Sequence, residues 1–222
     1  MKKKLFLAPH FADIAWSCSG LILMNISDSI VANVFSAKPE DMNARKSLTY
    51  DQEMERHSEE KFFEKFGIES VQLDFKEALS RGRKIEEFFS LKLNEEEEKL
   101  ILDLAISLGD LIGKYRVSEL FCPKAIRHHI DHYIVKKSVE KIMSPVEIYY
   151  YEDAPIFIQD KSKEKIPENL KEIKIDISSV IEEKIQGLLF YPSTIKAHYK
   201  SEESVVKAIR ENPYENYWRV IE

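Results

Sequence analysis

"KLFLAPHFADIAWSCSGLILMNISDSIVANVFSA", residues 4–37, is the stretch that decides the fold. Its first run, residues 4–9, is short and apolar, and its last run, residues 29–37, is rich in β-branched and aromatic side chains. Between them, residues 13–25 place apolar side chains at helical spacing. A strand, a helix and a second strand within about thirty residues form a βαβ unit, whose strands are parallel. The stretch therefore predicts an α/β fold.

The rest of the chain continues this alternation. Gly67 and Asn94 suit the end of one helix and the start of the next. Residues 159–172 are expected to be a surface excursion, and the residues after 191 continue into a polar tail. The elements predict one Rossmann-like, three-layer α/β domain over residues 1–222, with a mostly parallel sheet. The patterns place helices at residues 50–67, 94–115, 133–143 and 177–191, and strands at residues 70–75, 117–123 and 146–153.

Composition excludes several classes of function. The 222 residues are 44% hydrophobic and 32% charged, and the net charge of -6 argues against a nucleic-acid partner. No apolar run approaches the length of a membrane span, and residues 5–8 are too few for the core of a signal peptide. Two cysteines make no disulfide framework, so we expect a cytoplasmic protein. The sequence leaves a homo-oligomer open.

Two polar clusters follow predicted strands. His10 and Asp13 come after the first strand, and residues 128–132, with the sequence HHIDH, come after the strand at 117–123. Ligands bind beyond the carboxyl ends of the strands in open α/β sheets, so the clusters meet if these strands are neighbours. The second cluster holds three of the six histidines in the chain. We therefore expect one polar site at this edge of the sheet.

Imidazole and carboxylate groups in this pattern point to a metal. A catalytic zinc site uses three such protein ligands and keeps one position open. His10, Asp13 and one histidine of the second cluster would supply that set, although iron or another divalent ion would also accept it. Each residue also has a structural explanation, with His10 entering a helix and Asp13 capping it. His128 and His132 match the spacing of a zinc-protease helix, but His129 stands where that motif requires a glutamate.

Five motifs support a more specific resemblance. In chain order they are APHFAD with SCSG, RHSEEKFFEKFGI, HIDH, YYYEDAP and KIQGLLFYPSTI, between residues 7 and 195. Their order and spacing resemble the LmbE-like, or PIG-L, family of zinc-dependent N-deacetylases, which act on N-acetylglucosaminyl compounds. The family typically carries Pro-His-x-Asp-Asp near the start of the chain and His-x-Asp-His in the middle. The resemblance implies the same α/β fold and an amide hydrolase.

The resemblance also implies roles for individual residues. His10, Asp13 and His132 would hold Zn²⁺. His129 would polarise the amide oxygen or protonate the leaving amine, and Asp131 would orient neighbouring groups.

Residues outside these two motifs have weaker support. Arg56 corresponds to an arginine that faces the substrate in the family, and a salt bridge with Glu59 or Glu60 is an equally good explanation for it. Glu152 and Asp153 lie at the end of a predicted strand near the site, and we assign neither a role.

Ala12 departs from the family pattern. The first aspartate of the family's Asp-Asp pair is the general base, and a methyl group cannot accept a proton. General-base assistance is worth roughly 10²–10⁴-fold in rate. Ala12 does not stand at a ligand position, so its side chain does not prevent metal binding. Two other departures are Arg127 and Ser19, which both replace a glycine.

Three hypotheses follow. The first is a zinc-dependent N-deacetylase of an N-acetylated amino sugar or sugar conjugate, with chemistry impaired or altered by Ala12. The missing base would be replaced by Asp131, by a loop carboxylate or by the substrate. The second is a catalytically inactive family member that binds a sugar or a partner. The third is a structural protein without a metal, in which replacing His132 would change little.

Overall fold

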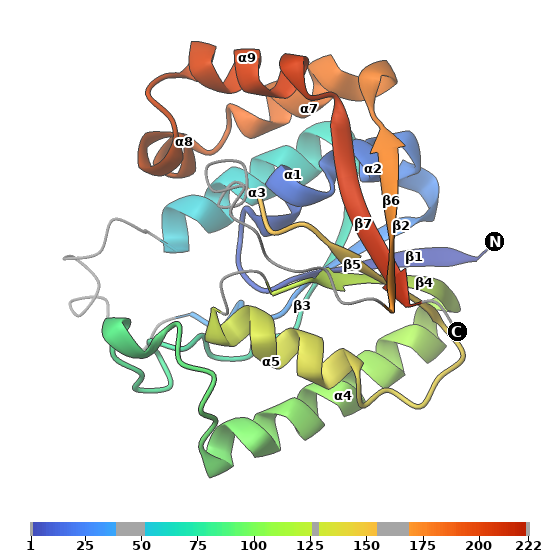
Figure 1. Cartoon of the computed structure of the whole chain (residues 1–222), viewed down its shortest axis with the longest axis vertical. Coiled ribbons are helices and arrows are strands. Elements are labelled where there is room, and N and C mark those ends of the chain that lie inside the picture. Colours follow the sequence, from blue (N-terminus) through green and yellow to red (C-terminus); the bar gives the residue numbers. More distant parts are fainter. Residues whose placement is uncertain (1, 39–51, 126–128, 155–168, 221–222) are drawn as a thin grey trace.

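The computed structural model describes residues 2–38, 52–125, 129–154 and 169–220. Its centre is a seven-stranded sheet with the strand order β3-β2-β1-β4-β5-β7-β6 (Figure 1). The first five strands are parallel, and β7 pairs antiparallel with both β5 and β6. The prediction of an α/β fold with a mostly parallel sheet is confirmed. The strands are β1 Lys3–Ala8, β2 Ser29–Asn33, β3 Glu69–Gln72, β4 Val117–Pro123, β5 Glu147–Tyr151, β6 Leu170–Asp176 and β7 Tyr214–Val220.

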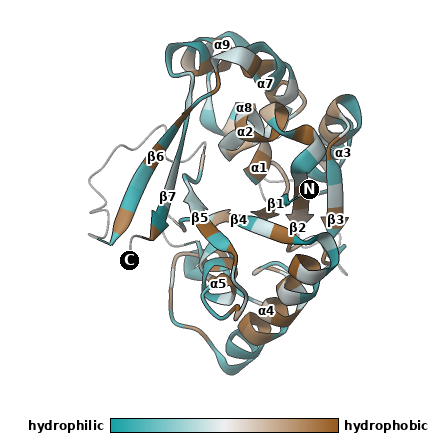
Figure 2. Ribbon diagram, turned by 90° about the vertical axis from the view of Figure 1, so that its right-hand side faces the viewer, coloured by the Kyte–Doolittle hydropathy of each residue, from teal (hydrophilic) through white to brown (hydrophobic). Residues whose placement is uncertain are grey.

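Helices cover both faces of this sheet (Figures 1 and 2). Helices α4 and α5 pack on one face, and α1, α2, α3 and α7 pack on the other. Short 3₁₀ turns are η1 Ile26–Asp28, η2 Ile85–Glu87 and η4 Ser178–Val180. The α-helices are α1 Asp13–Ser17, α2 Ser19–Met24, α3 Gln52–Phe66, α4 Glu95–Tyr115, α5 Ile130–Val139, α7 Ile181–Leu188, α8 Pro192–His198 and α9 Glu202–Glu211.

The alternation of side chains along β1 explains the two apolar layers. Phe6 and Ala8 face the layer that contains α1 and α7, whereas Leu5 and Leu7 face the layer that contains α4 and α5. All four side chains are fully buried. Because successive residues of a strand point to opposite faces, a continuous apolar run fits a strand that is covered on both sides.

The pairing of β1 with β4 brings the two polar clusters together. These strands are parallel neighbours, with Phe6 opposite Phe121. The turn after β1 and the segment after β4 therefore leave the sheet at the same edge. The expectation that the two clusters meet there is confirmed.

The helix predicted at residues 13–25 is two helices. Cys18 separates α1 from α2 with φ −131° and ψ −2°, which are outside the helical region. Glu215, from distant β7, accepts hydrogen bonds from the backbone N–H groups of Gly20 (2.7 Å) and Leu21 (3.0 Å). A carboxylate at a helix start suits the unpaired N–H groups there. Apolar spacing could not reveal this break, because the partner comes from the other end of the chain.

The prediction of a polar tail after residue 191 is wrong. This region contains α8, α9 and strand β7, which lies inside the sheet between β5 and β6. Strand β6 also begins within the predicted surface excursion, at Leu170. In β7 the consecutive residues Tyr217 and Trp218 are buried in opposite core layers, whereas β6 at the edge of the sheet is exposed or half-buried along its length.

Helix α5 begins at Ile130, three residues before the predicted start. Asp131 and His132 therefore belong to its first turn. Arg127, His128, residues 39–51 and residues 159–168 of the predicted excursion lie outside the described residues. In the part of the chain that is described, no helix has the length and apolar character needed to cross a membrane.

Candidate functional site

A cavity of about 360 Å³ lies at the carboxyl ends of β1 and β4. Its polar lining comes from both predicted clusters, from the end of β5, from Glu77 and from Thr194 and His198 on α8. One further wall comes from the segment between β3 and α4, referred to below as the 76–93 segment. The lining includes His10, Phe11, Ala12, Asp13, Trp16, Glu77, Ala78, Leu79, Ile85, Phe88, His129, Asp131, His132, Asp153, Ala154, Thr194 and His198.

His10, Asp13 and His132 face one another in this cavity. Asp13 Oδ2 lies 3.3 Å from His132 Nε2 and 3.6 Å from His10 Nδ1. A tetrahedral zinc ion with ligand bonds of roughly 2.0–2.2 Å holds its ligand atoms about 3.3 Å apart. The donor set and its spacing therefore fit a zinc ion.

A carboxylate holds the other ring nitrogen of each histidine. His10 Nε2 lies 2.8 Å from Asp131 Oδ2, and His132 Nδ1 lies 2.6 Å from Asp153 Oδ1. Metal-binding histidines usually donate their second N–H to a carboxylate or a carbonyl, which fixes the tautomer and turns the first nitrogen to the ion. The arrangement leaves Nδ1 of His10 and Nε2 of His132 for the metal.

The same carboxylates make the cavity electronegative. Burial alone would lower the pKa of His132, but Asp13 and Asp153 raise it well above the usual value. Burial likewise opposes protonation of His10, and the hydrogen bond and charge of Asp131 raise its pKa. Groups that stabilise a proton on imidazole also stabilise a divalent cation in the same place, so metal and protons compete for this site.

His129 differs from the other two histidines. Its Nδ1 accepts a hydrogen bond from the backbone N–H of Asp131 at 3.3 Å, so in the neutral ring Nε2 carries the proton. Burial, with His10 nearby, lowers its pKa to about 3. Nitrogen atoms of His10, His129 and His132 lie within 4.8 Å of one another, so these three form an alternative ligand set. The hydrogen bond to Nδ1 instead favours a donor role for His129 Nε2, because a protonated nitrogen cannot bind a metal.

Asp131 is enclosed by donors. Its Oδ2 also accepts the backbone N–H of Ala78 at 3.0 Å, and Arg81 lies 2.8 Å from its Oδ1. Burial would raise the pKa of Asp131, but His10 and Arg81 hold it well below the usual range. A carboxylate so strongly stabilised as the anion is a poor proton acceptor.

Ala12 lies at the start of α1 with a left-handed backbone, φ 77°. It precedes the helix, so Asp13 is not the N-cap, and the Asp13 side chain instead accepts the N–H of His10 at 2.7 Å. The backbone N–H of Ala12 donates to buried Glu59 at 3.0 Å. Aspartate and asparagine tolerate the left-handed region better than alanine, so this backbone suits an aspartate.

Arg56 is not among the residues that line the cavity. Its guanidinium lies 4.7 Å from the centre of the Phe11 ring and donates to the carbonyl of Ser36. Its nearest described carboxylate is that of Glu53, at 3.9 Å, rather than that of Glu59 or Glu60.

Sequence reasoning missed most of the 76–93 segment. Glu77 lines the cavity, and Leu79, Ile85 and Phe88 form an apolar wall beside it. No motif or periodic pattern marks these residues. The sequence placed Asp153 at the end of a predicted strand. Its contact with His132 could not be predicted, because that contact depends on how far β5 extends.

Comparisons with known proteins find similar chains among deacetylases. No family model matches the chain. The 2'-N-acetylparomamine deacetylase of Streptomyces fradiae is 24% identical over 207 residues, which cover 86% of this chain and 73% of that protein. The solved structure of the zinc-inhibited form of teicoplanin deacetylase Orf2 matches with a TM-score of 0.79 and 16% identity, over 99% of this chain and 98% of that one.

These likenesses agree with the resemblance to the LmbE-like, or PIG-L, deacetylases, and the solved structure shows that the fold is shared. Proteins of similar fold are not confined to deacetylases. The 4-carboxy-2-hydroxymuconate hydratase GalB of Pseudomonas putida matches with a TM-score of 0.59 and 14% identity, over all of this chain and 97% of that one. Function has therefore to be argued from the site.

Proposed function

We propose that this protein is a zinc-dependent N-deacetylase of an N-acetylated amino sugar or sugar conjugate. The observation that carries the proposal is the approach of His10, Asp13 and His132 to within 3.3–3.6 Å at Asp13, with a carboxylate behind each histidine. The deacetylase activity named for the 24% identical relative supports the choice of reaction.

In this reaction water adds to the acetyl carbon, the carbon–nitrogen bond breaks, and acetate and a free amine leave. A zinc ion held by His10, Asp13 and His132 would polarise the acetyl carbonyl and lower the pKa of water. Neutral His129 presents Nε2–H to the oxygen that becomes negative in the transition state. Asp131 and Asp153 keep the ligand histidines oriented.

The proton of the attacking water needs an acceptor that passes it to the leaving amine. Ala12 supplies none. Among the carboxylates of the described cavity lining, Asp13 would bind the metal, while Asp131 and Asp153 hold histidines. We propose Glu77 for the role of general base, because it is a buried carboxylic residue that lines the same cavity.

A second candidate is a sugar-binding or partner-binding protein without turnover. Ala12 favours it, because the residue lines the cavity and brings no acid–base group to it. The two candidates share the metal and the cavity and differ only in the chemical step.

Metal content tests the shared part. We expect about one zinc per chain by mass spectrometry after dialysis, lost in His132→Ala and kept in His57→Ala. His57 is a matched control, because its side chain is 66% exposed on α3. One equivalent of metal should be supplied rather than an excess, since zinc inhibits one solved neighbour. A wild-type protein that takes up no zinc, cobalt or iron would contradict the metal centre.

Acetate release tests the chemical step. Restoring a carboxylate with Ala12→Asp should raise the rate at least tenfold on N-acetylglucosamine conjugates, since general-base assistance is worth roughly 10²–10⁴-fold. Ala12→Asn, which tolerates the same backbone but accepts no proton, should not. Glu77→Gln should abolish turnover when Ala12 is present. In the Ala12→Asp protein, the same substitution should lower the rate of acetate release much less. Binding of the conjugate without acetate release by any of these variants would favour the binding protein.

A further inference from the structure

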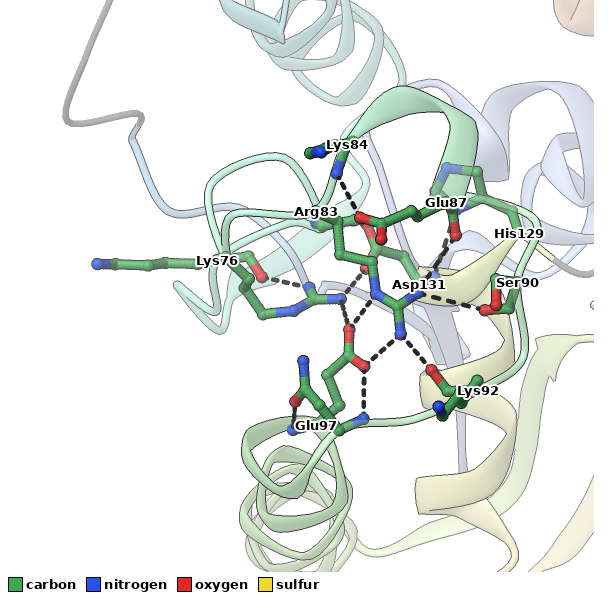
Figure 3. Close-up of polar contacts among 12 residues, drawn as sticks. Lys76, Arg83, Lys84, Glu87, Ser90, Lys92, Glu97, His129 and Asp131 are labelled. Atoms are coloured by element: carbon green, nitrogen blue, oxygen red, sulfur yellow. Dashed lines mark hydrogen bonds and ion pairs between the residues drawn. The ribbon is translucent and has the colours of Figure 1, made fainter.

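A buried series of ionic contacts runs from the candidate metal centre to helix α4. Asp131 lies 2.8 Å from His10 through Oδ2 and 2.8 Å from Arg81 through Oδ1. The same nitrogen of Arg81 lies 3.4 Å from Glu97 Oε1. Figure 3 shows Asp131 and Glu97 among the polar contacts of this region. Asp131 and Glu97 are each only 1% exposed, so these charges interact in a poorly solvated environment.

The contact with Arg81 fixes the rotation of the Asp131 carboxylate. Oδ2 accepts from the backbone N–H of Ala78 and contacts His10, and Oδ1 faces Arg81 in an ion pair that lacks hydrogen-bond geometry. Together these contacts favour one orientation of the carboxylate. Without the Arg81 guanidinium, Oδ1 of the buried Asp131 carboxylate would lose its cation. The free-energy cost of such an unpaired buried charge is large enough to make the Asp131 side chain rotate or the 76–93 segment move.

Arg81 is itself anchored. It donates to the carbonyl of Lys76 at 2.7 Å, and its guanidinium lies 5.2 Å from the centre of the Phe35 ring. Its partner Glu97 belongs to the first turn of α4, where it shares a capping box with Asn94. The orientation of Asp131 is therefore set by the start of a 21-residue helix.

We infer that Arg81 is a positioning residue that holds Asp131 in the orientation that turns His10 Nδ1 into the metal centre. The inference rests on the proposed function for the identity of the metal. The hydrogen bond between His10 and Asp131 consists of protein atoms alone, so it is measurable whether or not the protein hydrolyses anything.

The competing explanation is that the cluster only fastens the 76–93 segment to α4. Arg83 provides that fastening and is the matched control. It donates to Glu97 through Nε at 2.7 Å and to the carbonyls of Lys92 (2.7 Å) and Ser90 (3.4 Å). Its described hydrogen bonds and ion pairs do not include Asp131. Arg81→Met and Arg83→Met thus remove the same charge from the same segment, and only the first removes a contact to the site.

The test uses the full chain and two readouts. The first is zinc affinity, measured by competition with a chromogenic chelator. Loss of a residue that orients a metal ligand typically weakens affinity 10–100-fold. The second is the downfield NMR resonance of the His10 imidazole N–H in ¹⁵N-histidine-labelled protein, assigned by its absence in His10→Gln.

We expect Arg81→Met to weaken zinc binding 10–100-fold and to shift or lose the His10 N–H resonance. Arg81→Lys should restore part of the zinc affinity and of the resonance. Arg83→Met should leave the zinc affinity and the resonance near wild type, even if its melting temperature falls more than that of Arg81→Met. Zinc affinities within threefold of wild type and an unchanged resonance in Arg81→Met would overturn the inference. If the wild type binds no zinc, the proposed function fails, and the resonance alone decides whether Arg81 positions His10.

Discussion

Two buried ionic clusters lie on opposite faces of the sheet, and each pairs a cation with a carboxylate. One joins elements of the fold, and the other contacts the candidate site. On the face covered by α7, Lys184 lies 2.6 Å from Glu215 and donates to the carbonyl of Trp16 at 3.0 Å. Every described partner of this cluster is a protein group that joins α1 and α2 to β7 and α7. On the face covered by α4, the Arg81 cluster ends at His10, which lines a cavity.

The difference lies in what each cluster leaves unpaired. The Lys184 cluster closes on itself, and neither Lys184 nor Glu215 lines the described cavity. The Arg81 cluster holds one nitrogen of His10 and leaves the other directed at Asp13. A buried ion pair is weak evidence for net stability, but breaking one by removing a single partner is strongly destabilising. The first cluster should therefore matter most for folding, and the second for the site.

The largest expected effect is on the Lys184 cluster. Lys184→Met leaves Glu215 buried without its cation, so we expect the free energy of unfolding to fall by roughly 3–5 kcal/mol. Zinc affinity, measured well below the melting temperature, should stay near wild type. Lys207→Met is the control, because that lysine forms an exposed pair with Glu211 at 3.7 Å and should cost at most about 1 kcal/mol. A large loss of zinc affinity in Lys184→Met would erase the distinction between the two clusters.

A smaller effect is expected for a buried carboxyl that has no cationic partner among the described residues. Glu55 is fully buried and accepts a hydrogen bond from Thr194 at 3.1 Å, and its Oε2 has no hydrogen-bond partner among the described residues. Burial raises its pKa from 4.5 to about 7. Between these pH values the folded protein keeps a proton that the unfolded chain has lost. Stability should therefore fall as pH rises from 4.5 to about 7 and stay level above that.

Glu55→Gln should remove this dependence. Urea unfolding from pH 5 to pH 8 should show wild type losing up to about 3 kcal/mol relative to the variant. Glu64→Gln, on the exposed side of the same helix, should follow wild type. Parallel curves for wild type and Glu55→Gln would show that Glu55 is ionised in the folded protein across this range.

The contrast between the clusters also explains what the sequence could predict. His10, Asp13, His129 and His132 were identifiable because local motifs place them at strand ends. That β1 and β4 are neighbours was a condition that the sequence left open and the structure fulfils. The partners of these residues were not identifiable. Arg81 comes from a segment without periodicity, and Glu215 on β7 accepts hydrogen bonds from Gly20 and Leu21 near the other end of the chain. Such long-range partners depend on tertiary packing, which no local pattern encodes.

The smallest expected effect concerns the apolar wall that the Arg81 cluster helps to place. Ile85 lines the cavity but is 52% exposed, and the neighbouring Phe88 carbonyl accepts the N–H of Ile130 at 2.7 Å, which ties the wall to α5. If the substrate is a sugar conjugate, its non-sugar part would cover Ile85. Ile85→Asn should then raise KM for an N-acetylglucosamine glycoside with an apolar group about 5–10-fold, equivalent to about 1 kcal/mol of lost apolar burial.

The same variant should leave KM for free N-acetylglucosamine and the melting temperature unchanged, because Ile85 is already half exposed in the protein alone. Ile106→Asn is the matched control, since Ile106 is 66% exposed on α4 and does not line the cavity. If turnover is too slow to measure, calorimetric Kd values for the two sugars serve in place of KM. An equal loss of affinity for both sugars would mean that Ile85 shapes the sugar subsite itself. No loss of affinity for either sugar would show that the apolar wall does not bind substrate. Positioning of the metal ligands would then be the single role of the Arg81 cluster.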